Sequence, residues 1–219
     1  MAFNVGFDFR LTSGFVTDPT NYTYVLASDT SSSNSRTPVG QSSPVSFYWQ
    51  NVGGTNPSAR DRSAAEIAQC AGMNFINNFA GTGLFDDFTL TLPTAGSYSV
   101  ALAMGDPTTG GAQNQYFSLF DGSNTTALAS ATNVSTAVDH FMDIKGTVWN
   151  TGATWLANNV AGTYTFTTTT LRLRIGSGIT SGSNSSTIAC LIVQLLAASS
   201  NAGPTVLMHR RNQLFYIPT

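Results

Sequence analysis

Residues 85–104 read FDDFTLTLPTAGSYSVALAM, and this stretch decides the fold class that the sequence predicts. On each side of Pro93-Thr-Ala-Gly96, apolar residues alternate with small or polar ones. A period of two is typical of a strand with one buried face, and Pro and Gly mark a turn. The stretch predicts a β-hairpin with a four-residue connection, whose apolar faces are Phe88, Leu90 and Leu92 on one strand and Tyr98, Val100, Leu102 and Met104 on the other.

Strand-like segments of the same kind continue in both directions along the chain. Segments 116–120 and 126–131 flank the turn signal Asp121-Gly122 and predict a second hairpin. Only residues 63–70 carry a helical signal, with Ser63 as N-cap and Glu66 three residues later. The remaining predicted strands are 3–10, 22–26, 47–49, 140–148, 162–170, 171–175 (the last two either separate or one long bent strand) and 188–198. Strands at this spacing predict an all-β fold, an antiparallel β-sandwich or jelly roll of about 8–10 strands over residues 1–200, followed by a C-terminal arm over 201–219.

Charged residues make up only 9% of the chain, against about 25% in an average soluble domain. Ser, Thr, Asn and Gly replace them, which suits an extracellular protein or one buried among neighbours, where each desolvated charge is costly. The net charge is -2, and the basic residues form isolated pairs rather than a patch. Nucleic-acid binding is therefore not expected. Arg172 and Arg174 lie two apart and share one face of a strand, where we interpret them as a paired surface feature rather than a phosphate site.

Two cysteines, Cys70 and Cys190, lie in apolar contexts without a C-x-x-C motif, which favours buried thiols over a zinc site. A disulfide between them would require the two segments to lie side by side in the fold. The N-terminus shows no Sec-type signal, and the longest apolar run, residues 188–198, is too short to cross a bilayer. A membrane partner is not expected, and a protein working outside the cell would leave by lysis or within a particle.

Several segments taken together resemble galactose-binding-like β-sandwich modules of the malectin-like, carbohydrate-binding type. They are GFDFR (6–10), FYW (47–49), ARDRSAAEIAQCAGMNF (59–75), the 88–106 stretch and QYFSLFDG (115–122). Such modules often carry a P-x-x-G-x-Y-x-V-x-L pattern, which here runs from Pro93 to Leu102. The resemblance covers about residues 3–197 and implies a sandwich fold; similar modules occur in glycan-active enzymes and in bacteriophage particle proteins. The arm after residue 200 departs from it.

A catalytic set is hard to assemble from this chain. Asp86-Asp87 is the only adjacent carboxylate pair, and neighbours along a strand point to opposite faces. His140 and Asp143 fit a structural role better than a catalytic one. No nucleophile elbow or nucleotide-binding loop is present. The sequence therefore predicts a protein that is not an enzyme and has no cofactor or metal, with a structural calcium ion at some of Asp8, Asp18, Asp29 or Asp143 as an open alternative.

Two sets of residues are candidates for binding. Aromatic faces stack on sugar rings, while amides and guanidinium groups bind hydroxyls; the candidate glycan ligands are Trp49, Arg60, Asp61, Arg62, Asn114, Trp149 and Trp155. Core tryptophans and an ion pair that pins a loop are the competing explanations for this set. The second set is the apolar part of the C-terminal arm, a candidate interface: Val206, Leu207, Met208, Leu214, Phe215, Tyr216 and Ile217.

These observations give two main hypotheses of function. In the first, the chain is a non-enzymatic structural or decoration protein of a virion (capsid, head or tail-fibre associated) that assembles with copies of itself or other virion proteins through β edges and its arm. In the second, it is a carbohydrate-binding module that recognises a cell-surface glycan. Both place the protein in a virion or outside the cell.

Overall fold

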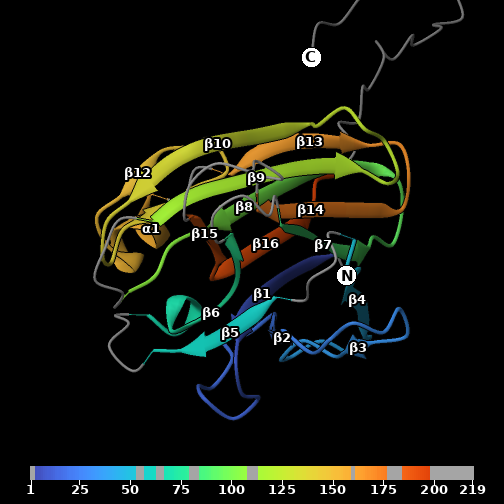
Figure 1. Cartoon of the computed structure of the whole chain (residues 1–219). Helices are drawn as coiled ribbons and strands as arrows, with labels where there is room; N and C mark the ends of the chain where they lie inside the picture. The colour runs from blue at the N-terminus through green and yellow to red at the C-terminus, as the bar shows by residue number, and fades with distance from the viewer. Residues whose placement is uncertain are drawn as a thin grey trace, which may run out of the picture.

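The computed structural model describes residues 3–52, 57–62, 67–78, 84–107, 113–158, 161–176 and 184–197. Two stacked β-sheets dominate these ranges, which confirms the predicted all-β sandwich (Figure 1). The first has five strands, in the order β13 (Gly162–Phe166), β8 (Gly96–Ala103), β16 (Cys190–Leu195), β1 (Asn4–Arg10) and β2 (Tyr22–Leu26). The second has six, in the order β10 (Ala129–Thr136), β9 (Gln113–Asp121), β14 (Thr170–Gly176), β7 (Phe85–Thr91), β4 (Val45–Trp49) and β3 (Ser35–Arg36).

Smaller elements complete the described fold. A three-stranded sheet has the order β15 (Asn184–Ile188), β6 (Gly72–Asn78) and β5 (Ser58–Asp61), and β11 (Phe141–Met142) pairs with β12 (Val148–Trp149). The helical elements are η1 (Ala68–Cys70) and α1 (Gly152–Ala157). Helix α1 begins at an N-cap, Thr151, whose side chain accepts a hydrogen bond from the Thr154 N–H.

The main core lies between the two large sheets. Strand alternation turns Phe7 and Phe9 of β1 inward, where both rings lie within 5.5 Å of the Phe88 ring of β7, centroid to centroid. Trp49 contacts the same Phe88 ring at 5.5 Å. Edge-to-face packing of this kind adds to the stabilisation from burial. In Figure 1, β1 (dark blue) lies beside β16 (red-orange), so segments from the two ends of the described chain pair within the five-stranded sheet.

A second, smaller core covers the outer face of the five-stranded sheet. The side chains that point outward from β8 and β16 here include Ala103 and Cys190, both fully buried. Trp155 of α1 packs against them and donates its indole N–H to the Leu102 carbonyl at 2.9 Å. Cys70 belongs to the same cluster, and both cysteines are buried free thiols, as predicted.

The two predicted hairpins have different outcomes. Strands β9 and β10 pair antiparallel, which confirms the second hairpin. The first prediction is wrong: β7 pairs with β4 and β14, while β8 pairs with β13 and β16 in the other sheet. Residues 92–95 are therefore a corner between the sheets. A similar corner separates β13 from β14, which excludes one continuous bent strand over 162–175.

Candidate functional site

The outer face of the six-stranded sheet is polar because its strands alternate. Phe47 and Trp49 of β4 point into the core, so Tyr48 between them points outward. On β7, Phe88 and Leu90 are core residues, and Thr89 faces the same side as Tyr48. The sequence alternation thus produces a continuous outer surface of hydroxyl, amide and charged groups.

Strand register arranges these side chains in rows across the sheet. Thr89 pairs with Tyr48 of β4 on one side and with Arg172 of β14 on the other. In the next row, Asp87 pairs with Arg174, and the Gln50 N–H donates to the Asp87 carbonyl at 2.9 Å. Cross-strand neighbours on one face lie about 5 Å apart, so each row is a continuous strip of side chains.

These rows form the floor of a groove of about 690 Å³, which we call the sheet groove. Its floor consists of Tyr48, Gln50, Asp87, Thr89, Arg172 and Arg174, and its rim includes Gly122, Ser123, Thr125 and Thr168. The volume is within the range of about 300–1,000 Å³ that is usual for small-molecule sites.

One carboxylate holds both arginines of the floor. Asp87 is fully buried, and its Oδ2 accepts from Arg172 Nη1 at 2.6 Å and from Arg174 Nη2 at 3.0 Å. Its Oδ1 accepts from Arg174 Nε at 2.7 Å. The guanidinium groups also cover aromatic rings, Arg172 over Phe120 at 4.3 Å and Arg174 over Phe85 at 3.9 Å. Charge-assisted bonds and stacking together hold the floor in a fixed geometry.

The rim is tied to the floor through two side chains. Arg172 donates from Nε to the Gly122 carbonyl at 2.9 Å and from Nη2 to the Asn124 carbonyl at 2.7 Å. Asp121 accepts four hydrogen bonds, from the N–H and hydroxyl groups of Thr167 and Thr168. Burial disfavours its ionised form, but these hydrogen bonds outweigh burial and lower the pKa of Asp121. The β9–β10 and β13–β14 connections are therefore anchored beside the groove.

The three tryptophans proposed as stacking platforms lie elsewhere. Trp49 and Trp155 are fully buried in the two cores. Neither ring face is accessible to a sugar, so neither residue can be the predicted stacking platform. Trp149 is half-buried, and its indole N–H donates to Asp143 Oδ2 at 3.0 Å. The accessible aromatic ring of the FYW segment is that of Tyr48.

The proposed polar ligands are also outside the sheet groove. Arg60 is exposed over the Phe75 ring at 4.6 Å, and Arg62 forms an ion pair with Asp106 at 2.9 Å. Asp61 accepts hydrogen bonds from the N–H groups of Leu11 and Thr12 and from the Thr12 hydroxyl. Asn114 lies half-buried on β9 opposite Ser135. Asp61 thus holds residues 11–12 through hydrogen bonds, and the ion pair of this set is the one between Arg62 and Asp106.

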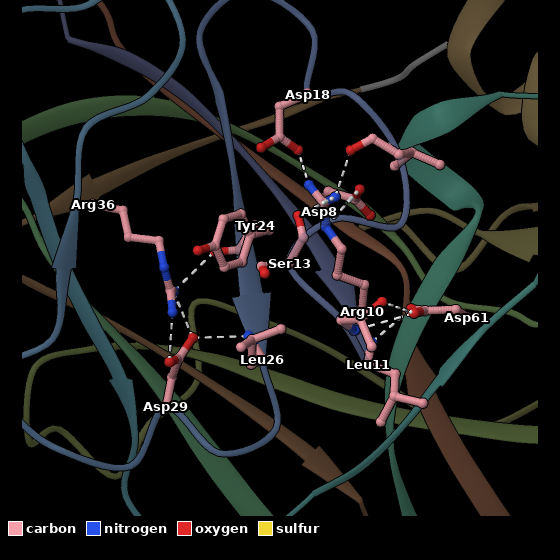
Figure 2. Close-up of polar contacts among 12 residues, drawn as sticks. Asp8, Arg10, Leu11, Ser13, Asp18, Tyr24, Leu26, Asp29, Arg36 and Asp61 are labelled. Atoms are coloured by element: carbon pink, nitrogen blue, oxygen red, sulfur yellow. Dashed lines mark hydrogen bonds and ion pairs between the residues drawn. The ribbon is translucent and has the colours of Figure 1, made fainter.

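A second polar cluster lies around β1 and β2 (Figure 2). The Tyr24 ring lies 5.0 Å from the Arg10 guanidinium carbon and 4.2 Å from that of Arg36. Arg10 is fully buried and forms ion pairs with Asp8 and Asp18, while Arg36 and Asp29 form a bidentate pair at 2.6 and 2.7 Å. These charged groups pair with one another inside the cluster, and the pairs hold together the segment from residue 10 to residue 36.

The candidate calcium ligands are engaged in other contacts. Asp8, Asp18 and Asp29 face the arginines just described, and Asp143 accepts from the N–H groups of Lys145 and Thr147. Within the described residues, no group of three or more His, Cys, Asp or Glu side chains is placed to hold a metal ion. In the same ranges, no helix has the length and hydropathy needed to cross a bilayer. The candidate interface residues 206–217 lie outside the described residues.

Comparison with known proteins gives matches among solved structures alone. No protein-family model matches the chain, and no curated protein matches it. The chain is similar to the CBM22-1–GH10 modules of endo-1,4-β-D-xylanase 10B from Clostridium thermocellum, complexed with xylohexaose, with 13% identity and a TM-score of 0.37. That match covers 69% of this chain but 27% of the xylanase chain, so the protein spans about a quarter of its length.

Two isolated carbohydrate-binding modules are similar to the same degree. A family 35 module from Clostridium thermocellum has 12% identity and a TM-score of 0.35, over 68% of this chain and 92% of the module. CBM35 from Paenibacillus barcinonensis has 13% identity and a TM-score of 0.33, over 69% and 98%. All three TM-scores are below 0.5, so these similarities carry no conclusion about ligand or activity.

Proposed function

We propose that this chain is a carbohydrate-binding domain that holds a glycan in the sheet groove. The observation that carries the proposal is the composition of the groove floor. A half-buried aromatic ring, Tyr48, lies beside hydroxyl, amide and guanidinium groups on three neighbouring strands. A sugar presents an apolar C–H face and a ring of hydroxyls, and this floor offers a partner for each.

The floor also contains a buried hydroxyl group that makes no hydrogen bond within the described residues. Thr89 is 4% exposed, and its hydroxyl oxygen has no hydrogen-bond partner among the described residues. A buried hydroxyl without a partner costs about 1–3 kcal/mol. A ligand hydroxyl that reached Thr89 between Tyr48 and Arg172 would remove that penalty on binding.

The activity proposed is binding without bond cleavage. Glycoside hydrolysis usually needs two carboxyl groups on either side of the scissile bond. Asp87 is the carboxylate of the described groove lining, and both of its oxygens accept hydrogen bonds from arginines. Of the two hypotheses from the sequence, the groove favours glycan binding; within the described residues nothing comparable favours the role in a virion.

The test is titration of the ¹⁵N-labelled protein with a panel of oligosaccharides, followed by calorimetry on any that bind. Shift changes should gather on β4, β7 and β14. Tyr48→Ala should weaken binding at least about tenfold, because it removes the stacking ring. Thr163→Ala, on the exposed part of β13 in the opposite sheet, is the matched control and should leave affinity unchanged. Shift changes confined to other surfaces, or no binding at millimolar ligand, would refute the proposal.

A further inference from the structure

We propose that the sheet groove selects glycans that carry an oxyanion, a uronate carboxylate or a sulfate ester, and that Arg174 binds this group. The proposal rests on the proposed function, since it concerns the same groove. Its starting point is the charge on the groove floor, where Arg172 and Arg174 face the single carboxylate of Asp87. The floor therefore carries an excess of one positive charge.

The two arginines differ in how many of their donors are used. All three nitrogens of Arg172 donate, to Asp87 and to the Gly122 and Asn124 carbonyls. Arg174 donates from Nε and Nη2 to Asp87, and its Nη1 has no partner among the described residues. A guanidinium has five N–H donors, so Arg174 retains the edge formed by Nη1 and the second Nη2 hydrogen. This edge matches the two oxygens of a carboxylate or sulfate.

Arg174 is also held in place before any ligand arrives. Asp87 fixes one edge of its guanidinium, and the Phe85 ring supports one face at 3.9 Å. Its side chain is 30% exposed, against 13% for Arg172. A fixed and partly desolvated cation binds an anion more strongly than a mobile surface arginine does, because less side-chain entropy is lost on binding.

Neighbouring carboxylates leave this edge open. Asp86 lies on the opposite face of β7, where its Oδ1 accepts from the N–H groups of Val52 and Asp87. Asp121 is occupied by the four donors of Thr167 and Thr168. Both charges reduce the general potential around the groove, and neither accepts a hydrogen bond from Arg174.

The experiment uses calorimetry to compare the acidic and the neutral form of the same oligosaccharide. The probes are tetragalacturonate and a hyaluronan tetrasaccharide, each with its uronates free or as methyl esters, and a sulfated galactose tetrasaccharide. The free acids should bind at least about tenfold more tightly than the esters at low salt. This preference should shrink as NaCl rises, because added salt screens the charge. The sulfated probe shows whether sulfate and carboxylate serve equally.

Variants assign the preference to one side chain. Arg174→Gln should reduce the preference for acid over ester to about onefold, because the charged edge that meets the anion is lost. The matched control is Arg60→Gln, which removes an arginine that also stacks on a ring but lies outside the groove. Thermal unfolding of both variants checks that Asp87, still paired with Arg172, keeps the sheet intact.

The outcomes separate this inference from the proposed function. If acid and ester bind equally and Tyr48→Ala weakens both, the groove binds glycans and the selectivity for anions is wrong. A preference that persists in Arg174→Gln would also overturn the inference. If no oligosaccharide binds in either form, the proposed function itself fails.

Discussion

At the scale of single residues, Asp8 lies in an environment that opposes its charge. It is fully buried, neither carboxylate oxygen has a hydrogen-bond partner among the described residues, and the nearest cation is Arg10 Nε at 3.4 Å. Burial raises the pKa of Asp8 to about 7, with Arg10 lowering it and Asp61 raising it further. Cys190, its pairing partner on β16, and Cys70 of η1 are the other titratable groups that interact with it.

This environment predicts a protein that is more stable in mild acid. The folded state holds a proton on Asp8 up to about pH 7, while the unfolded chain loses it near its ordinary pKa of 3.8. Asp8 should therefore contribute the larger part of a decline in the free energy of unfolding, about 1.4 kcal/mol per pH unit from about pH 4 to 7. Asp8→Asn should remove most of this decline, as measured by urea unfolding at pH 5 and pH 8.

Asp86 provides the comparison for that measurement. Burial raises its pKa to about 6, against the backbone hydrogen bonds that lower it, so it contributes a smaller decline of the same sign. Asp86→Asn should keep the larger part of the dependence. A wild-type protein equally stable at pH 5 and pH 8 would show that Asp8 is solvated or better paired than its contacts indicate.

The sequence could predict part of the groove at this scale. Alternation along a strand places Tyr48 and Trp49 on opposite faces, and it places Arg172 and Arg174 on the same face. Which of the two aromatic residues faces the core is decided by the pairing of β4 with β7. The sequence predicts Trp49 as the platform, whereas the structure buries Trp49 and leaves Tyr48 accessible. Asp87 lies 85 positions from Arg172, and no local pattern indicates that the two meet.

At the scale of elements, the connection between β13 and β14 depends on a side chain from another strand. Asp121 of β9 accepts hydrogen bonds from Thr167 and Thr168, which lie in that connection. Asp121→Asn keeps the size of the side chain but turns an amide N–H₂ toward groups that are themselves donors. We expect it to lower the free energy of unfolding by about 2 kcal/mol at pH 7.

The pH dependence of the Asp121 effect has the opposite sign to that of Asp8. Because the folded-state pKa of Asp121 is lowered, its contribution is complete above the unfolded pKa and is lost as the pH falls through the folded value. The gap between wild type and Asp121→Asn in urea unfolding should close below about pH 4. Thr168→Val, which removes one hydroxyl donor, should cost about 1 kcal/mol. A larger loss for Thr168→Val than for Asp121→Asn would contradict this account of the corner.

The corner at residues 92–95 shows why the pairing of strands is harder to predict from a sequence than the strands themselves. Two consecutive strands with alternating apolar faces fit a hairpin, in which they pair, and equally fit a corner, in which they face each other across a core. Leu92 and Tyr98 both belong to the main core, and the Tyr98 hydroxyl donates to the Thr94 carbonyl at 2.6 Å. Each strand joins its sheet through partners that lie 60 or more positions away in the sequence, such as Thr163 for Ser99 and Arg172 for Thr89.

On the scale of the whole molecule, the two hydrophobic cores share the strands that separate them. Leu102 and Leu191 point into the main core, while their neighbours Ala103 and Cys190 point into the second core. The Trp155 indole also donates to the backbone of Leu102. Loss of either core should therefore expose β8 and β16 and destabilise the other, so we expect both to unfold in one cooperative transition.

Two tryptophans provide a separate probe for each core. A chain with Trp49 alone (Trp149→Phe, Trp155→Phe) reports on the main core, and one with Trp155 alone (Trp49→Phe, Trp149→Phe) reports on the second. In each variant the urea midpoint from tryptophan fluorescence should coincide with the midpoint from far-UV circular dichroism of the same variant, because one transition exposes both cores. A Trp155 signal that changes at lower urea than the dichroism would instead identify the second core, with α1 and η1, as a unit that opens while the sandwich and its groove stay folded.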